Sequence, residues 1–394
     1  MPVEDPSLEK DIPTGIEMLK TPVWEPYDLY KKFVGRKKED KINSAFLSEG
    51  KKSGITEKLS VWIRGNFFIP DARMFWIKPS VKFLSDYLLN NKTDAIASTG
   101  PPHSMHLIAS KLKKKFPLPW LADFRDPWTN IDYYHDLMLT RWADKRHHLL
   151  EKMVIEKADA VVTVGKTMKD EFVKKLTKSN AQKFHVITNG YDESDISGNS
   201  DEPDKKFSIA HIGSLVKTRN PGILWKALAE LIIEIPELKN HLEIKLVGKV
   251  DFSVSESIKK HKLINFIQKT EYIEHGRIIG VMKQSQVLLL LLNNTPNAKG
   301  ILTGKLFEYL AAKRPVLCIG PEDGETAAIL AETGAGECVN FNDMIRLKKI
   351  IAEYFRKFQN KELSVSSSRI EKYSRRNLTM QLAGILNHIT MNSS

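Results

Sequence analysis

Short apolar segments alternate with amphipathic helical patterns along most of this chain, and this alternation constrains the fold more than any other feature. Strands that alternate with helices of about 10–15 residues form parallel sheets that are covered by helices on both faces. The expected strands lie at 95–99, 119–123, 159–164, 184–188, 207–212, 242–247, 286–292, 315–319 and 337–341. One further short strand is expected at 15–19.

Helical patterns fill the intervals between the expected strands. They lie near 79–91, 103–115, 135–157, 167–177, 221–234, 276–285, 303–312, 325–333 and 342–358. The residues from 366 onward are expected to form a final helix pair or one bent helix. In doubly wound folds ligands bind beyond the carboxyl ends of the strands, so the residues that follow each strand are the candidates for function.

A polar, breaker-rich run around 197–204 interrupts the alternation and predicts an interdomain linker. A length of 394 residues also favours two domains. We therefore expect an α/β protein with two doubly wound, Rossmann-like domains. The expected boundaries are an N-terminal domain at 1–197, a linker at 198–206, a C-terminal domain at 207–365 and a C-terminal helical segment at 366–394.

Composition narrows the classes of partner and compartment. Lys and Arg number 60 against 48 Asp and Glu, a net charge of +12, which favours nucleic acid, a phosphorylated small molecule or an acidic membrane surface. No nucleic-acid-binding motif is visible, so nucleic acid is not an expected partner. Cys318 and Cys338 form no CxxC pair, which favours a reducing, cytoplasmic setting and argues against structural zinc. The longest apolar run, 287–292, is too short to span a membrane, and the polar N-terminus has no signal-peptide pattern.

The first candidate cluster follows the strand expected at 119–123. Asp123, Arg125 and Asp126 come together there, just before Pro127 and Trp128. Three charges at a strand end are costly unless they are paired or bound to a ligand. One interpretation is an internal Arg–Asp bridge with a Trp plug, and the other places Arg125 and Asp126 in a cleft against a polar ligand.

The second candidate cluster follows the strand expected at 207–212. Gly213 provides a tight turn, Lys217 and Arg219 follow it, and Pro221 opens a helix. Backbone amides together with these cations suit a phosphate group. The alternative interpretation is a solvated basic turn.

The third candidate cluster surrounds the start of the helix expected at 303–312. Gly304 lies at or near the helix start, which leaves amide donors free for an anion. Glu308 lies about one turn into the helix and is expected to point toward the cleft, where it could accept hydrogen bonds from a ribose diol. A carboxylate that serves only the helix dipole is the alternative. Lys299 and Leu306 occupy the positions where a P-loop needs a glycine and a hydroxyl residue, so no P-loop is present.

Four strings in this order, ADFRDPW, VITNGYD, HIGSL…RNP and LTGKLFEYLAAKRPVL, resemble the retaining glycosyltransferases of family 4, which have the GT-B fold. WIRGNFFIPDARMFW and PVEDPSLEKDIP further resemble the bacterial branch that builds surface polysaccharides. The likeness extends over essentially the whole chain. It implies two facing Rossmann-like domains, a nucleotide sugar in the C-terminal one, and a C-terminal helix that crosses back to the N-terminal domain.

The resemblance also implies roles for individual residues. Glu308 would hold the ribose, and the amides around Leu302, Thr303 and Gly304 would hold the diphosphate. Arg219 falls where the family usually has a phosphate-binding Lys. Arg125 and Asp126 fall where many members have a His-Asp pair that contacts the donor sugar. The full set of donor-binding candidates is Gly213, Ser214, Lys217, Arg219, Leu302, Thr303, Gly304, Lys305 and Glu308.

Three departures from the family pattern stand out. Gly300 replaces the first Glu of the family's Glu-x7-Glu pair, which bears on sugar choice and mechanism. Ser214 replaces an expected phosphate-binding Arg, leaving the charge to Arg219 with Lys217 or Lys305. The family opens with a strand, a Gly-rich turn, a helix and a second strand, and this chain starts downstream of that unit. A mis-assigned start or a truncated gene would explain this, and a chain complete at this length would have questionable activity.

The sequence thus predicts transfer of a sugar from a nucleoside diphosphate sugar to a lipid-linked or saccharide hydroxyl, with retention, in cell-surface polysaccharide synthesis. No cofactor and no metal are expected, because cations and a helix N-terminus would neutralise the leaving diphosphate. The catalytic candidates are Arg125, Asp126 and His103, and His103 could equally be a helix-start residue. The alternatives are a catalytically inactive glycosyltransferase-like subunit and a sugar-nucleotide epimerase.

Basic and aromatic side chains in the N-terminal half also suggest a peripheral contact with the anionic inner face of the cell membrane. They are Lys31, Lys32, Arg36, Lys37, Lys38, Lys41, Lys111, Lys113, Lys114 and Lys115, with Trp62 and Trp76. Ordinary solvated lysines are the alternative interpretation.

Overall fold

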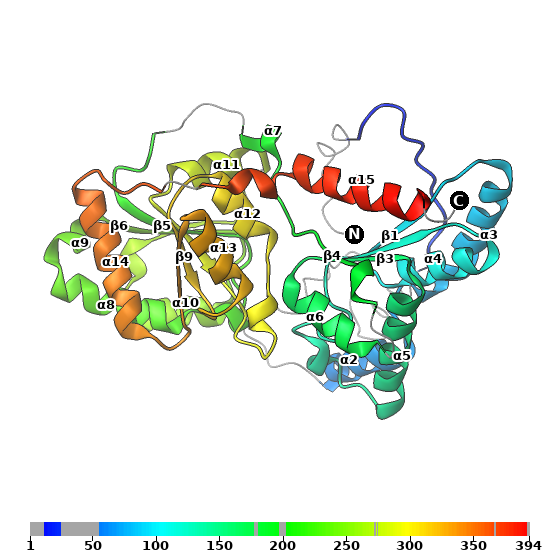
Figure 1. The fold of residues 1–394 in the computed structure, drawn as a ribbon. Coiled ribbons are helices and arrows are strands. Elements are labelled where there is room, and N and C mark those ends of the chain that lie inside the picture. Colours follow the sequence, from blue (N-terminus) through cyan, green and yellow to red (C-terminus); the bar gives the residue numbers. More distant parts are fainter. Residues whose placement is uncertain are drawn as a thin grey trace.

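A computed structural model describes residues 12–24, 55–176, 180–196, 202–271, 273, 275–365 and 368–391. Its strands form two separate parallel sheets, one before residue 187 and one after residue 206. Helices cover both faces of each sheet, as the alternation in the sequence predicts (Figure 1). The architecture is therefore two doubly wound α/β units arranged side by side.

The N-terminal sheet has four strands in the order β1-β2-β3-β4, all parallel. Its strands are β1 (Ile96–Gly100), β2 (Trp120–Phe124), β3 (Ala160–Thr163) and β4 (Phe184–Val186). The helices of this half are α2 (Ile55–Phe67), α3 (Ile77–Asn90), α4 (Ser104–Lys115), α5 (Arg141–Lys157), α6 (Lys166–Lys175) and α7 (Glu193–Ile196).

Side chains alternate strictly between the two faces of this sheet. On β2, Trp120, Ala122 and Phe124 pack with α3, α4, α5 and α6, whereas Leu121 points to the opposite face. That opposite face is covered by α15 (Arg375–Met391), through Leu378 and others. Both strand faces are therefore buried, which explains why these strands read as nearly continuous apolar runs.

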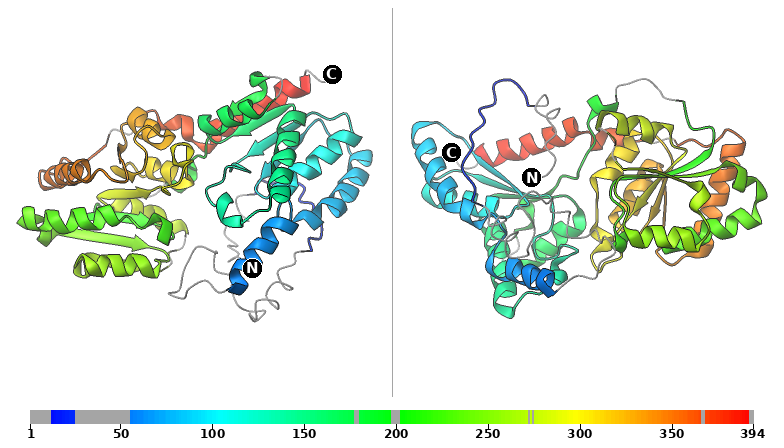
Figure 2. Two further views of the ribbon diagram at one scale, coloured as in Figure 1. Left: turned by 90° about the horizontal axis from the view of Figure 1, so that it is seen from below. Right: turned by 180° about the vertical axis from the view of Figure 1, so that it is seen from behind.

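Helix α15 is a single helix that begins after a short 3-10 turn at Ile370–Tyr373. It leaves the C-terminal half and runs along the N-terminal sheet in all views (Figures 1 and 2). Tyr191 and Ser374 form an isolated parallel bridge where the chain crosses back. The last segment of the chain therefore packs with both halves of the molecule.

The C-terminal sheet has six strands in the order β10-β9-β8-β5-β6-β7. Its strands are β5 (Phe207–Ile212), β6 (Leu242–Val247), β7 (Ile267–Thr270), β8 (Val287–Leu291), β9 (Val316–Ile319) and β10 (Gly336–Val339). The helices are α8 (Gly222–Glu234), α9 (Pro236–His241), α10 (Phe252–Lys260), α11 (His275–Gln284), α12 (Gly304–Ala311), α13 (Glu325–Thr333) and α14 (Met344–Gln359).

Two apolar clusters bury the faces of this sheet. Helices α8, α10 and α14 cover one face, and α12 and α13 cover the other. Cys318 and Cys338 are register partners on β9 and β10, and both are buried free thiols. In the part of the chain that the structure describes, no helix is long and apolar enough to span a bilayer.

The structure departs from the sequence prediction at the sheet edge and in the N-terminal segment. The expected strand at 15–19 is not formed, and Ile16 and Met18 are exposed there, since no neighbouring strand lies beside them. Strand β7 was not predicted, because Gln268 and Lys269 on this edge strand are exposed and break the apolar run. The helix expected from 135 begins at Arg141, where Thr140 caps it by accepting a hydrogen bond from the Ala143 amide at 3.3 Å.

The aromatic stretch 61–76 forms the end of α2 and a short 3-10 turn at Met74–Trp76. Asn66 accepts a hydrogen bond from the Thr140 amide at 2.6 Å and so fixes α2 to the start of α5. Asp71 accepts hydrogen bonds from the amide and hydroxyl of Ser104, at 2.8 and 2.7 Å, and caps α4. The polar residues of this stretch thus hold the N-terminal helices in place.

Candidate functional site

The carboxyl ends of the two sheets meet across an interdomain boundary. Asn189, after β4, donates a hydrogen bond to the carbonyl of Leu302 at 3.3 Å. Asn297 donates to the carbonyl of Asn130 at 2.8 Å, and Asn293 donates to the carboxylate of Asp132. The loop between β8 and α12 therefore lies against the strand ends of the N-terminal half, where a doubly wound fold binds its ligands.

Two glycines shape the strand ends of the C-terminal sheet. Gly213, after β5, has φ +109°, and Gly248, after β6, has φ +115°. A Cβ on Gly248 would lie 2.8 Å from the backbone carbon of Gly213. A Cβ on Gly213 would overlap the ammonium group of Lys305. Glycine at both positions lets the backbone turn sharply and lets Lys305 lie directly over it.

Lys305 and Arg219 bring two positive charges together at this turn. Burial, and after it the positive charge of Arg219, lowers the pKa of Lys305 to about 8, although Glu308 opposes the shift. Burial likewise lowers the pKa of Arg219, and Asp132 opposes that shift. Two partly buried cations that repel each other attract an anion strongly.

The N-terminus of α12 adds hydrogen-bond donors to the same place. Thr303 is the N-cap residue, but its side chain accepts no capping hydrogen bond. Among the described residues, neither the buried Thr303 hydroxyl nor the buried Nε of Arg219 has a hydrogen-bond partner. Buried polar atoms normally have a partner, so both atoms are available to a ligand. We refer to Gly213, Arg219, Thr303 and Lys305 as the cationic cluster.

Helix α12 presents Glu308 beside the cationic cluster. Leu306, Phe307 and Leu310 are fully buried against the sheet, as predicted, while Glu308 is half-buried. Tyr309 anchors the helix, because its hydroxyl accepts a hydrogen bond from the Ile212 amide at 3.2 Å. The position of Glu308 next to Lys305 remains compatible with the predicted ribose contact.

The other predicted donor residues differ in exposure. Ser214, Lys217 and Gly304 are exposed at the rim of the cluster. Leu302 is buried, and its carbonyl faces Asn189. Since Lys217 is exposed and Lys305 lies over Gly213, the structure favours Lys305 as the second cation beside Arg219.

Arg125 is bound within the chain. Its guanidinium donates hydrogen bonds to the carbonyls of Ile187 and Thr188 at 3.2 and 3.1 Å, and to the Asn189 side chain at 2.5 Å. It also pairs with Asp123 at 3.4 Å. This geometry corresponds to the internal-bridge interpretation of the first candidate cluster, and a ligand contact by Arg125 stays a prediction.

Asp126 is exposed and lies near a second carboxylate, that of Asp132. Partial burial raises its pKa, Asp132 raises it further, and Arg125 opposes the shift. Asp132 and Tyr133 were not singled out from the sequence, because no motif marks them. Asp132 accepts a hydrogen bond from Asn293 of the C-terminal half, and its charge also acts on Arg219 of the cationic cluster.

His103 is buried at the start of α4. Its ring stacks on Trp128, with centroids 4.5 Å apart and planes 1° apart. Burial, and to a smaller extent His147, lowers its pKa to about 3, so the ring is neutral at physiological pH. This placement corresponds to the helix-start interpretation, and contact with a sugar or acceptor stays a prediction.

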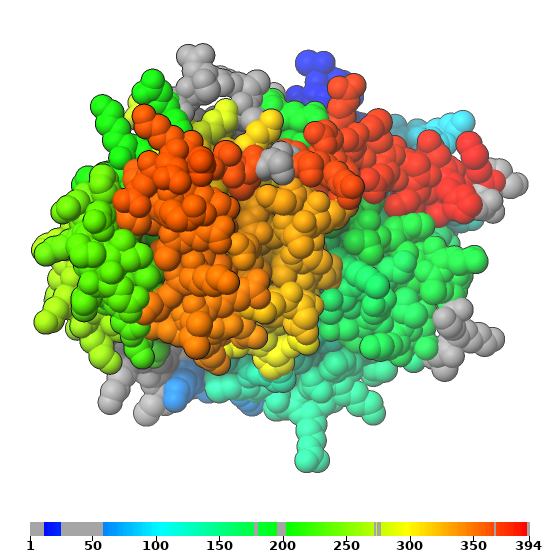
Figure 3. All heavy atoms as spheres, turned by 60° about the vertical axis from the view of Figure 1, so that its left-hand side comes forward, coloured from blue at the N-terminus to red at the C-terminus, as the bar shows by residue number. Residues whose placement is uncertain are grey.

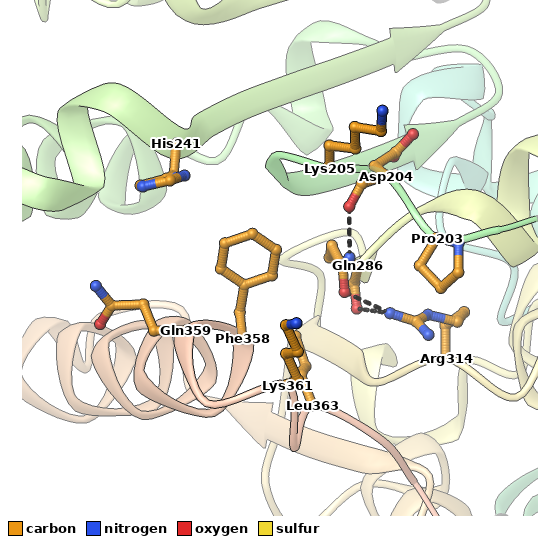
Figure 4. Close-up of a pocket in the computed structure, with 10 residues that line it drawn as sticks. All are labelled: Pro203, Asp204, Lys205, His241, Gln286, Arg314, Phe358, Gln359, Lys361 and Leu363. Carbon is orange, nitrogen blue, oxygen red and sulfur yellow. Dashed lines mark hydrogen bonds between the residues drawn. The ribbon is translucent and has the colours of Figure 1, made fainter.

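A cavity of about 670 Å³ lies at the opposite, amino-terminal edge of the C-terminal sheet (Figure 4). Arg314 in its wall donates hydrogen bonds to the carbonyl of Ser285 at 2.7 Å and to the side chain of Gln286 at 2.6 Å. Asp204 is paired with Lys245 at 2.7 Å. These charged groups satisfy helix and strand ends, so the cavity offers less to a ligand than the cationic cluster does.

No group of three or more His, Cys, Asp or Glu side chains in the described residues could hold a metal ion.

Comparison with known proteins shows the fold. No family model and no curated protein sequence matches this chain. The sucrose-phosphate synthase of Thermosynechococcus elongatus superposes with a TM-score of 0.58 and 15% identity, covering 89% of this chain and 87% of that one. HepE of Anabaena, solved with UDP-glucose, gives 0.55 and 15%, covering 86% and 98%. The lipopolysaccharide outer core galactosyltransferase WaaB gives 0.53 and 13%, covering 79% of each chain. Like these proteins, the chain has the GT-B fold, with two Rossmann-like domains that face each other.

Proposed function

We propose that this protein transfers a sugar from a nucleoside diphosphate sugar to a hydroxyl acceptor. The observation that carries the proposal is the cationic cluster at the N-terminus of α12, where Arg219 and Lys305 repel each other and the Thr303 hydroxyl has no described hydrogen-bond partner. A diphosphate would neutralise both cations and accept hydrogen bonds from the Thr303 hydroxyl and the helix amides. The presence of UDP-glucose in the HepE structure, which has the same fold, supports the same class of donor.

The proposed reaction depends on stabilisation of the leaving diphosphate. Arg219, Lys305 and the N-terminus of α12 offset the negative charge that develops on the diphosphate as the bond to the sugar breaks. Glu308 is proposed to hold the ribose hydroxyls. The chain is already closed around this position by contacts between the two domains, which would limit access of water to the donor.

The acceptor side of the proposal involves the carboxylates of the N-terminal domain. Asp126 is exposed, and its raised pKa reflects both partial burial and the nearby Asp132. A carboxylate in such a place can accept the hydrogen bond of an incoming hydroxyl. Retention at the anomeric carbon, which membership of family 4 would imply, is proposed to occur by substitution on the face that the diphosphate leaves.

We further propose a lipid-linked or saccharide acceptor, in surface-polysaccharide synthesis at the cytoplasmic face of the membrane. Exposed apolar side chains near the junction of α2 and α5 support a peripheral contact, with Phe67 64% and Trp142 68% exposed. Arg64 and Arg141 lie exposed beside them in the sequence and could contact anionic lipid headgroups.

The lysines from which we predicted this contact support it less. Lys113 pairs with Asp159, and Lys115 donates a hydrogen bond to Ser85 at 3.1 Å. The basic cluster at 31–41 lies outside the described residues. If a peripheral contact exists, the junction of α2 and α5 is its best-supported site.

A catalytically inactive, nucleotide-binding subunit is the second candidate function. Gly300 favours it, because a Cβ at this position would lie 2.9 Å from the side chain of Thr167. The larger side chain of a Glu, as the family pattern has here, would require this part of the interface to move apart. A chain without that carboxylate could bind a donor and still transfer sugar poorly.

The two candidate functions separate in a two-step experiment on the full chain. Thermal unfolding with UDP, GDP, ADP and their sugar conjugates first identifies a bound nucleotide, since a ligand at 100 times its Kd stabilises by about 2.7 kcal/mol. Release of the nucleoside diphosphate from the matching sugar donor, with and without saccharide acceptors, then tests transfer. Acceptor-dependent release supports the transferase, binding without release supports the inactive subunit, and a converted sugar without acceptor would indicate an epimerase.

A further inference from the structure

Glu325, the first residue of α13 in the C-terminal domain, crosses the interdomain boundary to the N-terminus of α6. Its carboxylate accepts hydrogen bonds from the amides of Lys166 and Thr167, at 2.9 and 2.7 Å. These are the first two residues of α6, whose amides have no partner within the helix. A carboxylate at a helix N-terminus is favoured by the amide donors and by the helix dipole.

The backbone on both sides of this contact is glycine. A Cβ on Gly165 would lie 2.6 and 2.8 Å from the two carboxylate oxygens of Glu325. A Cβ on Gly300 would lie 2.9 Å from the side chain of Thr167. Gly165 therefore leaves room for the Glu325 carboxylate, and Gly300 leaves room for the Thr167 side chain. In the space-filling view, the surface around α13 adjoins that of the N-terminal domain (Figure 3).

The same contact reaches the loop that carries the cationic cluster. Thr326, next to Glu325, donates a hydrogen bond to the carbonyl of Ile301 at 2.8 Å. On the other side, Asn189 of the N-terminal domain donates to the carbonyl of Leu302. Residues 300–302, just before Thr303, are therefore held between α13 and the N-terminal domain.

We propose that Glu325 is a positioning residue, and that its hydrogen bonds to α6 form an interdomain clasp that closes the cleft and fixes the loop before α12. The clasp is the Glu325 carboxylate with the amides of Lys166 and Thr167. When the clasp opens, the two domains separate and the loop at 300–302 loses its contacts with the N-terminal domain. That this loop then holds a diphosphate less tightly rests on the proposed function, whereas the clasp itself does not.

Domain separation in the ligand-free full chain tests the clasp directly. Spin labels on cysteines substituted for Lys174 on α6 and Lys226 on α8, both exposed, report the distance between the domains. Glu325→Ala is expected to shift the distribution toward longer distances. The expected change in the ratio of open to closed molecules is about 5- to 30-fold, the equivalent of about 1–2 kcal/mol for a capping interaction.

Gly165→Ala opens the clasp from the other side. The backbone of Gly165 has φ −152°, which alanine tolerates, so the substitution displaces only the mobile carboxylate of Glu325. It should lengthen the distance in the natural background and have no further effect when Glu325→Ala is present. Glu322→Ala is the matched control, because Glu322 pairs with Arg346 at 3.0 Å within its own domain.

Nucleotide affinity provides a separate readout. If the chain binds a nucleoside diphosphate, Glu325→Ala should weaken that binding several-fold and raise KM for the donor more than it lowers kcat, and Glu325→Asp should restore part of the affinity. Unchanged distances in both Glu325→Ala and Gly165→Ala would overturn the clasp. Longer distances in a chain that binds none of UDP, GDP and ADP would support the clasp and reject the proposed function.

Discussion

Where the two domains face each other, they differ in how their charged side chains are paired. On the C-terminal side, Arg219 and Lys305 lie close together and partly buried, and the Thr303 hydroxyl has no described hydrogen-bond partner. On the N-terminal side, Arg125 is bound by three backbone or side-chain oxygens of residues 187–189, and His103 is buried and neutral. The two cations of the C-terminal side thus keep their charge available to an anion, whereas on the N-terminal side Arg125 is already hydrogen-bonded and His103, whose Nδ1 has no described partner, carries no charge.

This difference indicates where binding energy is available to a ligand. Groups that are already hydrogen-bonded must lose those partners before they bind anything else, so their net contribution to binding is small. Cationic groups that have no partner and lie close to another positive charge gain the most free energy when an anion binds. Substitutions in the cationic cluster should therefore act on nucleotide binding, and substitutions of Arg125 and His103 should act on stability.

The largest expected effect is the loss of nucleotide binding in Lys305→Met. Hydrogen bonds to charged groups contribute about 1.5–3 kcal/mol, so affinity for the nucleoside diphosphate should fall about 10- to 150-fold. Isothermal titration calorimetry measures this change. Lys217→Met is the matched control, because Lys217 is exposed at the rim. This substitution should lower the affinity for the nucleoside diphosphate far less. Equal losses in both variants would contradict the role of the cationic cluster.

Arg125→Ala should reverse this pattern by lowering stability. The substitution leaves the carbonyls of Ile187 and Thr188 without their donor, which costs about 2–3 kcal/mol. A fall of roughly 5–10 °C in the unfolding midpoint is expected, and folded protein should still bind nucleotide within a few-fold of the natural chain. A large loss of affinity with unchanged stability would instead assign Arg125 to the ligand.

His103→Phe tests the neutral state of the buried imidazole. The pKa of His103 is about 3 in the folded chain and near 6.5 when unfolded, so the unfolded chain binds more protons between these values. Stability is therefore lost as the pH falls below about 6.5, by about 2 kcal/mol at pH 5 from this residue. Phenylalanine keeps an aromatic ring against Trp128. The unfolding midpoint of the variant should decline less between pH 7 and pH 5 than that of the natural chain. An unchanged decline would show that folding does not lower the pKa of His103.

The smallest expected effect is a decline of nucleotide affinity in alkaline solution. Lys305 has a pKa of about 8 in the folded chain, so it loses its charge above that pH. Affinity should fall about tenfold by pH 9 to 9.5, and Lys305→Met should show no such decline. Stability should change in the other direction and rise between pH 8 and about 10.5, because the unfolded chain holds this proton more tightly. Parallel pH profiles for both proteins would exclude Lys305 as the titrating group.

The sequence predicted the sheets well because their strands are buried on both faces. Apolar runs such as 207–212 and 242–247 coincide with β5 and β6. Strand β7 escaped prediction because an edge strand carries polar side chains such as Gln268 and Lys269. Helix α2 was not predicted, although Ile55, Leu59 and Ile63 follow helical spacing. Its C-terminal end is fixed by a contact far along the chain, that of Asn66 with Thr140.

The candidate site was predictable in part. The glycine turn at 213 and the helix start at 304 follow from the positions of strand ends, and these bring Arg219 and Lys305 into one region. The close approach of Lys305 to Gly213 could not be predicted, because it depends on how α12 packs across the sheet. Glu325 also escaped prediction, since its partners on α6 are 159 and 158 residues away and belong to the other domain.

The most direct test of the account is calorimetric titration of the full chain with a nucleoside diphosphate and with the corresponding nucleoside. UDP, GDP and ADP are compared with uridine, guanosine and adenosine, in the natural chain and in Lys305→Met. The account predicts that one diphosphate binds, that its nucleoside binds at least tenfold more weakly, and that Lys305→Met abolishes most of this difference. Absence of binding by every diphosphate to folded protein, or equal binding of a nucleoside and its diphosphate, would contradict the central claim that the cationic cluster holds a diphosphate.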